Sequence, residues 1–158
     1  MQTVSLLCAS FFVVLAAMDA AGAGEAWILD RQVGDKGQTC SLSRMDRGRR
    51  FSLTLAPSDN ATDQVVVGLA FDEPKLIQGA QKALATLEFD NGTSESHRIG
   101  LTPDGVLLVP IVTEDLQDIL RTFSESKKLT VATRFGSTSF GLDGLGARIP
   151  ALRDCAGG

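Results

Sequence analysis

The sequence predicts a mainly β fold: an antiparallel β-sandwich or partly closed barrel of about eight to nine short strands with two short helices. Apolar and polar residues alternate over short segments, as in strands with one buried face. Turn sequences such as Asp46-Arg47-Gly48 and Asn91-Gly92 separate these segments. The two helices are expected over residues 114–126 and 145–155. Because tight turns join antiparallel neighbours, the strands are expected to pair mostly with those next to them in the chain.

The first residues predict export. An apolar run from Leu6 to Met18 is followed by small residues ending in Ala21-Gly22-Ala23, the layout of a secretory signal peptide over residues 1–23. The alternative is a retained interfacial anchor, because no Lys or Arg precedes the apolar run. Residues 24–158 contain no repeat or linker and are expected to form a single domain. We therefore expect a periplasmic or secreted protein that has no membrane insertion after signal cleavage.

Three strands are expected at the start of this domain. Trp27 to Val33 alternates apolar and polar residues until the glycines of residues 34–37 break the pattern. Thr39 to Met45 and Arg49 to Ala56 follow, and the second alternates regularly. The Asp-Arg-Gly turn between them predicts a hairpin, because glycine adopts positive φ without steric cost.

The middle of the chain continues this β pattern. Val65 to Phe71 is an unbroken apolar run rich in β-branched residues, which predicts a strand buried on both faces. Residues 74–84 fit either a strand or a helical turn. Thr86 to Phe89 and Ser96 to Leu101 flank the Asn-Gly turn and predict a second hairpin. Val106 to Val112 is another apolar strand.

The period then changes to that of a helix. Four apolar residues lie at i, i+3, i+4 and i+7, namely Leu116, Ile119, Leu120 and Phe123. We expect a helix from Glu114 to Ser126 with Thr113 as its N-cap and acidic residues in its first turn. Leu129 to Phe135 and Thr138 to Leu142 then predict a hairpin around Gly136-Ser137.

The chain ends in a short apolar helix that carries a cysteine. Pro150 lies inside residues 145–155, so it is expected in the first turn, where its missing N–H costs no hydrogen bond. Cys8 lies in the signal peptide, which leaves Cys40 and Cys155 in the exported domain. An even number of cysteines in an exported protein predicts a disulfide between them. The alternative is two free thiols, one of them reactive.

No catalytic or metal-binding pattern stands out. His97 is the only histidine, and it lies in a polar hairpin with no clear nucleophile, so a surface or strand-face position is expected. One histidine and two paired cysteines are too few ligands for a zinc site. Gly144-Leu145-Gly146 lacks the third glycine of a dinucleotide-binding loop. Asn60 and Asn91 begin glycosylation sequons, relevant only in a eukaryotic host. We expect no enzyme activity, no cofactor and no metal.

The charge and aromatic content also limit the partners. The formal net charge is −4 and no tyrosine is present, so nucleic acid is not expected as a partner. The candidate partner-binding residues are Trp27, Arg47, Arg49 and Arg50. The alternatives are core packing for the tryptophan and a solvated hairpin tip for the arginines, to which Arg44 also belongs.

Several of these features resemble the invasion-associated locus B (IalB)-like family of small periplasmic proteins of Gram-negative bacteria. They are Trp27, Cys40, a helix and strand over Leu116 to Val131, and an ending in which Phe140, Leu142, Gly144, Ala147, Ala151, Leu152 and Cys155 keep a similar spacing. The chain departs from the family in having no further internal cysteines and in placing Pro150 in the last helix. The resemblance implies a non-catalytic periplasmic β-domain with cell-envelope or host-association functions, and it supplies no active-site residues.

Three functions are consistent with these features. The first is a protein-interaction module of the cell envelope, whose partner is another periplasmic or outer-membrane protein. The second is an inhibitor or immunity protein against an envelope-directed hydrolase, a protease or a lysozyme, which would present the loop of residues 46–50 or the Asn91 turn. The third is a small apolar-ligand barrel with a cavity lined by Val65 to Phe71 and Val106 to Val112.

Overall fold

A computed structural model describes residues 26–57, 65–72, 84–101, 106–112 and 115–157. The predicted signal peptide, the segment from Pro74 to Ala83 and the Asn60 sequon lie outside the described residues. Ten strands and three helical segments are described: β1 (Ile28–Gly34), β2 (Gly37–Asp46), β3 (Arg49–Pro57), β4 (Val65–Phe71), β5 (Leu84–Phe89), β6 (Ser94–Arg98), β7 (Gly100–Leu101), β8 (Leu107–Val112), α2 (Leu116–Glu125), β9 (Lys128–Thr133), β10 (Gly136–Gly141), η2 (Gly146–Arg148) and α3 (Ile149–Gly157).

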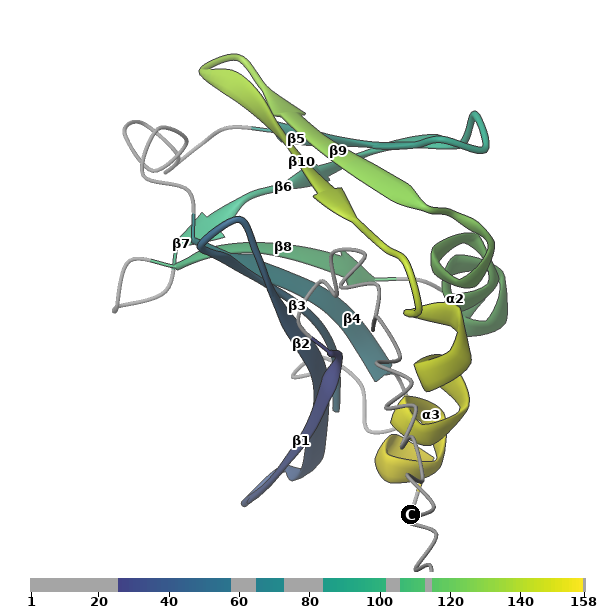
Figure 1. Ribbon diagram of the computed structural model, residues 1–158. Helices are drawn as coiled ribbons and strands as arrows, with labels where there is room; N and C mark the ends of the chain where they lie inside the picture. Colours follow the sequence, from purple (N-terminus) through teal and green to yellow (C-terminus); the bar gives the residue numbers. More distant parts are fainter. Residues whose placement is uncertain (1–25, 58–64, 73–83, 102–105, 113–114, 158) are drawn as a thin grey trace, which may run out of the picture.

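The strands form two antiparallel sheets, which confirms the predicted mainly β fold and favours the sandwich over the barrel. The larger sheet has the order β1-β2-β3-β4-β8-β7, and the smaller has the order β10-β9-β5-β6. The smaller sheet lies above the larger one in Figure 1, and α2 and α3 lie together at one side. Each predicted hairpin pairs strands that follow one another in the chain, as tight turns require.

The two sheets are joined at one edge by a single run of chain. β6 is the outer strand of the smaller sheet, and after Ile99 the chain continues as β7, the outer strand of the larger sheet. Ile99 is buried at this corner. The run predicted as one strand, Ser96 to Leu101, is therefore divided between the sheets, because a strand that changes sheets must bend.

Alternating side chains from both sheets fill the space between them. On β2 and β3, Leu42 lies opposite Leu53, and both are fully buried. The ring of Phe140 on β10 packs 5.0 Å from that of Phe51 on β3 and 5.4 Å from that of Phe71 on β4, measured between centroids. The aromatic contacts between sheets make this the centre of the core.

Helix α2 confirms the predicted helix but not its N-cap. Leu116 is its first residue, and the side chain of Asp115, two residues after the expected Thr113, accepts a hydrogen bond from the Asp118 N–H at 2.9 Å. Buried side chains of the helix face the core, and the Phe123 ring packs edge-on against Phe89 of β5 at 5.0 Å. The apolar spacing thus located the helix, and the cap differs because the first turn begins later.

The chain after α2 follows the prediction with one shift. The hairpin of β9 and β10 turns at Arg134-Phe135, two residues before the predicted Gly136-Ser137. Gly136 pairs with Thr133 and has a φ of 143°, so the predicted turn glycine begins β10 instead. The closing helix consists of η2 and α3, and Pro150 lies in the first turn of α3 as expected.

Within the ranges that the structure describes, no helix is long and apolar enough to cross a membrane.

Candidate interaction site

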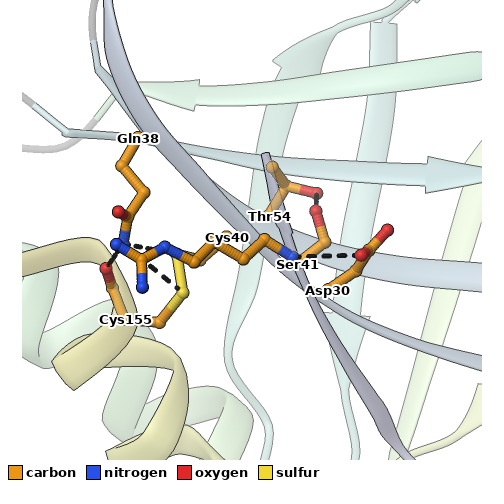
Figure 2. The surroundings of a disulfide bond; sticks show 7 residues. Asp30, Gln38, Cys40, Ser41, Thr54 and Cys155 are labelled. Atoms are coloured by element: carbon orange, nitrogen blue, oxygen red, sulfur yellow. Dashed lines mark hydrogen bonds between the residues drawn. A yellow bond between two sulfur atoms is a disulfide. The ribbon is translucent and has the colours of Figure 1, made fainter. Parts of the chain in front are cut away.

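The predicted disulfide joins the first half of the larger sheet to the last helix. Cys40 on β2 is fully buried, its sulfur bonds to that of Cys155 on α3, and the two Cα atoms are 6.1 Å apart (Figure 2). The Gln38 side-chain amide donates a hydrogen bond to the Cys155 carbonyl oxygen beside the disulfide. Ile149 and Leu152 of α3 are buried in the same core. The bridge therefore fixes the end of the chain against the strand on which the core is built.

Trp27 lies in the core and not at the surface. Only 7% of the residue is exposed, and its indole N–H donates to the Asp143 carbonyl oxygen at 2.9 Å. Its ring packs edge-on against Phe51 and carries the Arg44 guanidinium 4.6 Å from its centre. The core alternative for Trp27 is confirmed, because a buried ring with a bonded N–H has no surface left to anchor a partner.

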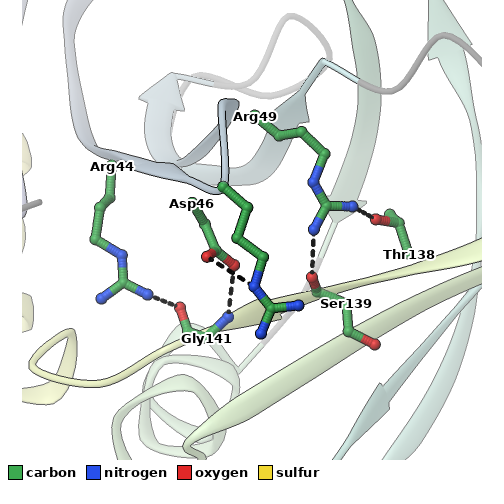
Figure 3. Close-up of polar contacts among 7 residues, drawn as sticks. Arg44, Asp46, Arg49, Thr138, Ser139 and Gly141 are labelled. Atoms are coloured by element: carbon green, nitrogen blue, oxygen red, sulfur yellow. Dashed lines mark hydrogen bonds and ion pairs between the residues drawn. The ribbon is translucent and has the colours of Figure 1, made fainter. Parts of the chain in front are cut away.

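Arg44, Asp46 and Arg49 bind the outer edge of β10, and we call this set the β10 clamp (Figure 3). β10 ends its sheet and pairs only with β9, so its other edge has backbone groups without strand partners. Arg44 donates to the Gly141 carbonyl oxygen, and the Gly141 N–H donates to Asp46 Oδ2 at 3.2 Å. Side chains of the β2–β3 hairpin thus occupy the positions of a neighbouring strand.

Arg49 completes the β10 clamp. Its prediction as a partner-binding residue is therefore corrected. It donates to the Ser139 carbonyl oxygen at 3.0 Å and to the Thr138 hydroxyl, and its guanidinium carbon lies 5.0 Å from the Phe140 ring centre. A guanidinium with three such contacts within its own chain is a structural group. Arg44 and Arg49 therefore do not belong to a solvated hairpin tip, as the alternative prediction had placed them.

The remaining arginines lie at the exposed end of the β2–β3 hairpin, which we call the hairpin tip (Met45, Arg47 and Arg50). The turn has positive φ at both central residues, 53° at Arg47 and 78° at Gly48, as a type I′ turn requires. The side chain of Arg47 is 86% exposed and that of Arg50 is 64% exposed. Asp46 and Asp72 lie 4.0 and 3.8 Å from these two groups, distances typical of weak, solvated ion pairs.

His97 lies on the face of β6 as predicted. Its Nε2 is 3.1 Å from Glu95 Oε2, so the one imidazole is paired with a carboxylate two residues away on the same strand face. Among the described residues no group of histidine, cysteine and acidic side chains could hold a metal ion.

The sequence carries a signal for the β10 clamp in the alternation of β2 and β3. Leu42 and Phe51 face the core, and two-residue periodicity places Arg44, Asp46 and Arg49 on the same face. Charged residues at core-facing positions need partners, because leaving a charge without one in a buried place is costly. The pattern indicated partners but could not say that β10, about 90 residues later in the chain, would supply them.

Comparison of the chain with protein-family models, with curated proteins and with solved structures gives no match. The resemblance to the invasion-associated locus B family stays a prediction.

Proposed function

We propose that this protein is an exported, non-catalytic interaction module of the cell envelope, and that the hairpin tip contacts another periplasmic or outer-membrane protein. The observation that carries the proposal is the backbone of Arg47. Among the described residues it is the one non-glycine residue with positive φ. Such a conformation costs about 1–2 kcal/mol for an ordinary side chain, and strained residues of this kind concentrate at functional sites.

The support beneath the tip makes it a suitable contact surface. Asp46 and Arg49 flank the turn and are both held by β10, so the position of Arg47 is fixed before any partner arrives. A preorganised loop loses little conformational entropy on binding. Exposed arginines beside a methionine also have the composition that is enriched at protein interfaces.

Export and the periplasm are part of the same proposal. The disulfide between Cys40 and Cys155 favours an oxidising compartment, because cytosolic thiols are kept reduced. The predicted signal peptide and the resemblance to the invasion-associated locus B family point to the same location. Detection of the chain without residues 1–23 in a periplasmic extract would support export, and recovery of the intact chain from the cytosol would contradict it.

Site-specific photo-crosslinking tests the proposed contact. A photoreactive amino acid replaces Arg47 in the full-length chain expressed in a Gram-negative host, and the matched control carries it at Gln32, an exposed residue of β1. We expect a discrete envelope-protein adduct from position 47 and none from position 32. Arg47→Glu with Arg50→Glu should weaken binding of the purified adduct partner by about tenfold or more. Equal adducts from both positions would contradict the assignment to the hairpin tip.

A second candidate, an inhibitor of an envelope-directed protease or lysozyme, is favoured by the same fixed and projecting arginine. An inhibitor needs a rigid loop that enters a groove, and a two-residue turn held on both sides has that shape. Residual activity of a panel of periplasmic proteases and lysozymes, titrated with the protein, measures this function. Inhibition by the unaltered chain that Arg47→Glu abolishes would select this candidate, whereas full residual activity throughout would exclude the enzymes tested.

A further inference from the structure

A second exposed cluster lies at one end of the smaller sheet, and we call it the sheet-end patch (Leu84, Arg98, Arg134 and Phe135). Leu84 on β5 lies opposite Arg98 on β6. On the other side of β5 the pairing with β9 ends at Thr86 and Ala132, and Arg134 follows two residues later in the β9–β10 turn. Figure 1 shows the start of β5, the end of β6 and the β9–β10 turn at the same end of this sheet. The four residues thus lie at one end of the smaller sheet, on β5, on β6 and in the β9–β10 turn.

Two large apolar side chains of the sheet-end patch are exposed to solvent. Leu84 is 59% exposed, and Phe135 is 37% exposed at the tip of the β9–β10 hairpin. The Arg134 guanidinium carbon lies 4.6 Å from the centre of the Phe135 ring. A leucine and an aromatic ring beside arginines resemble the anchor residues at the centre of protein interfaces.

The β9–β10 turn that carries Arg134 and Phe135 is held in one conformation. The Thr133 hydroxyl accepts from the Phe135 N–H at 3.1 Å and donates to the Gly136 carbonyl oxygen at 3.2 Å. One side chain therefore closes the two-residue turn from both ends. The arginine and the ring are presented without the entropy cost of ordering a loose loop.

The patch is positively charged on a protein whose formal net charge is −4. Arg98 and Arg134 are exposed, and neither makes an ion pair with any residue that the structure describes. The acidic residue Glu95 on β6 alternates to the other face of the sheet, where it pairs with His97. The patch therefore offers two guanidinium groups and two exposed apolar side chains at one end of the smaller sheet.

We propose that the sheet-end patch binds an acidic segment of a partner protein that carries an apolar side chain. Each guanidinium can bind a carboxylate with two parallel hydrogen bonds, and the leucine and phenylalanine would cover the apolar side chain between them. An anionic membrane is the less favoured occupant, because recognition of its surface uses clusters of about four to eight cations and this patch has two. The inference rests on the proposed interaction function and names one partner chemistry for it.

Fluorescence anisotropy with a labelled peptide of glutamates around one leucine tests the patch on the exported chain. We expect binding that weakens about tenfold with Arg134→Glu and about fivefold with Phe135→Ser. The matched control is Arg153→Glu on the exposed face of α3, which should leave the affinity unchanged. Replacing the peptide's leucine by serine, or its glutamates by lysines, should also weaken binding. Thermal unfolding of each variant shows that the fold is intact.

Three outcomes would overturn the inference: no binding of the glutamate–leucine peptide, equal loss with Arg134→Glu and Arg153→Glu, or binding to phosphatidylglycerol vesicles but not to the peptide. These outcomes are separate from failure of the proposed function. If photo-crosslinking at Arg47 captures a partner while the peptide does not bind, the interaction module stands and the sheet-end patch is excluded. If the peptide binds and position 47 gives no adduct, the patch stands and the hairpin tip is excluded.

Discussion

At the scale of single residues, Arg47 combines high exposure with an unfavourable backbone conformation. Asparagine and glycine are the residues that type I′ turns prefer at this position, because they tolerate positive φ. Arg47 has a φ of 53° and its side chain is almost fully solvated, so nothing within the described chain requires a long cation there. The conformational cost is consistent with selection of this arginine for contact with a partner.

Replacing Arg47 by asparagine should stabilise the protein while weakening the proposed contact with a partner protein. We expect Arg47→Asn to raise the free energy of unfolding by about 0.5–1 kcal/mol, because the new residue fits positive φ better. Urea unfolding measures the change, and Arg50→Asn on the same hairpin, in ordinary strand backbone, is the control that should not be stabilised. A loss of stability in Arg47→Asn would mean that the arginine side chain supports the fold.

At the scale of elements, helix α2 depends on a carboxylate at its first turn. The hydrogen bond from the Asp118 backbone N–H lowers the pKa of the Asp115 carboxyl below its ordinary value of 3.8, because it favours the charged form. A lowered pKa in the folded state means that the ionised cap stabilises the fold above that ordinary value. This stabilisation is lost as the pH falls through the lower folded-state pKa.

The acid sensitivity of the N-cap can be separated from its hydrogen bond. Asp115→Asn keeps an acceptor oxygen but does not titrate, so its melting temperature should fall less steeply than that of the unaltered protein below about pH 4. Asp115→Ala removes the acceptor and should melt lower at neutral pH as well. Circular dichroism melts between about pH 7 and about pH 2 measure both. Parallel curves for the unaltered protein and Asp115→Asn would show that another carboxylate dominates acid unfolding.

At the scale of the whole molecule, the disulfide and the β10 clamp are two long-range connections that stabilise the sandwich away from the β6–β7 corner. The disulfide connects residues 115 apart in the sequence and fixes α3 to β2 of the larger sheet. The β10 clamp connects the β2–β3 hairpin to the outer strand of the smaller sheet. The disulfide is covalent and stabilises the protein mainly by lowering the entropy of the unfolded chain. The β10 clamp is polar and stabilises the folded state through its hydrogen bonds.

Removing the disulfide should cost much of the protein's net stability. Cys40→Ala with Cys155→Ala should lower the free energy of unfolding by about 4–5 kcal/mol, because a loop of over about 100 residues is no longer closed in the unfolded chain. Guanidinium unfolding of the oxidised protein, the same protein under reductant and the double variant measures the loss. Adding reductant to the double variant, which lacks the disulfide, is the control. A difference below about 1 kcal/mol would show that packing of α3 alone holds the chain end.

Removing Arg49 should loosen the junction of the two sheets and expose an edge strand. We expect Arg49→Ala to lower the free energy of unfolding by about 1–2 kcal/mol, because the Ser139 carbonyl oxygen loses its donor and Phe140 loses the guanidinium above it. The open edge of β10 should also increase self-association, which sedimentation velocity detects. Arg50→Ala is the matched control and should change stability by less than about 0.5 kcal/mol. Equal effects of the two substitutions would contradict a structural role for the β10 clamp.

The sequence by itself determined the local elements. Two-residue alternation located the strands that flank Asp46-Arg47-Gly48, and the spacing of Leu116 to Phe123 located helix α2, because both periods are set by backbone geometry within a few residues. The pairing of Cys40 with Cys155 also followed from counting, since only two cysteines remain after the predicted signal. The turn at Arg134-Phe135 was placed two residues too late because neither residue is one of those that mark turns, whereas Gly136-Ser137 directly after it are.

The tertiary structure alone decided which residues are free to bind. Arg47 and Arg49 lie two residues apart in one basic cluster, yet the first projects into solvent and the second is bound to β10. The same holds for Leu84 and Arg134, which come to the same end of the smaller sheet only because β5 pairs with β9. Contacts between residues about 50 to 100 positions apart depend on how the sheets stack, which no local periodicity records. The division between structural and exposed cations is therefore a property of the folded molecule.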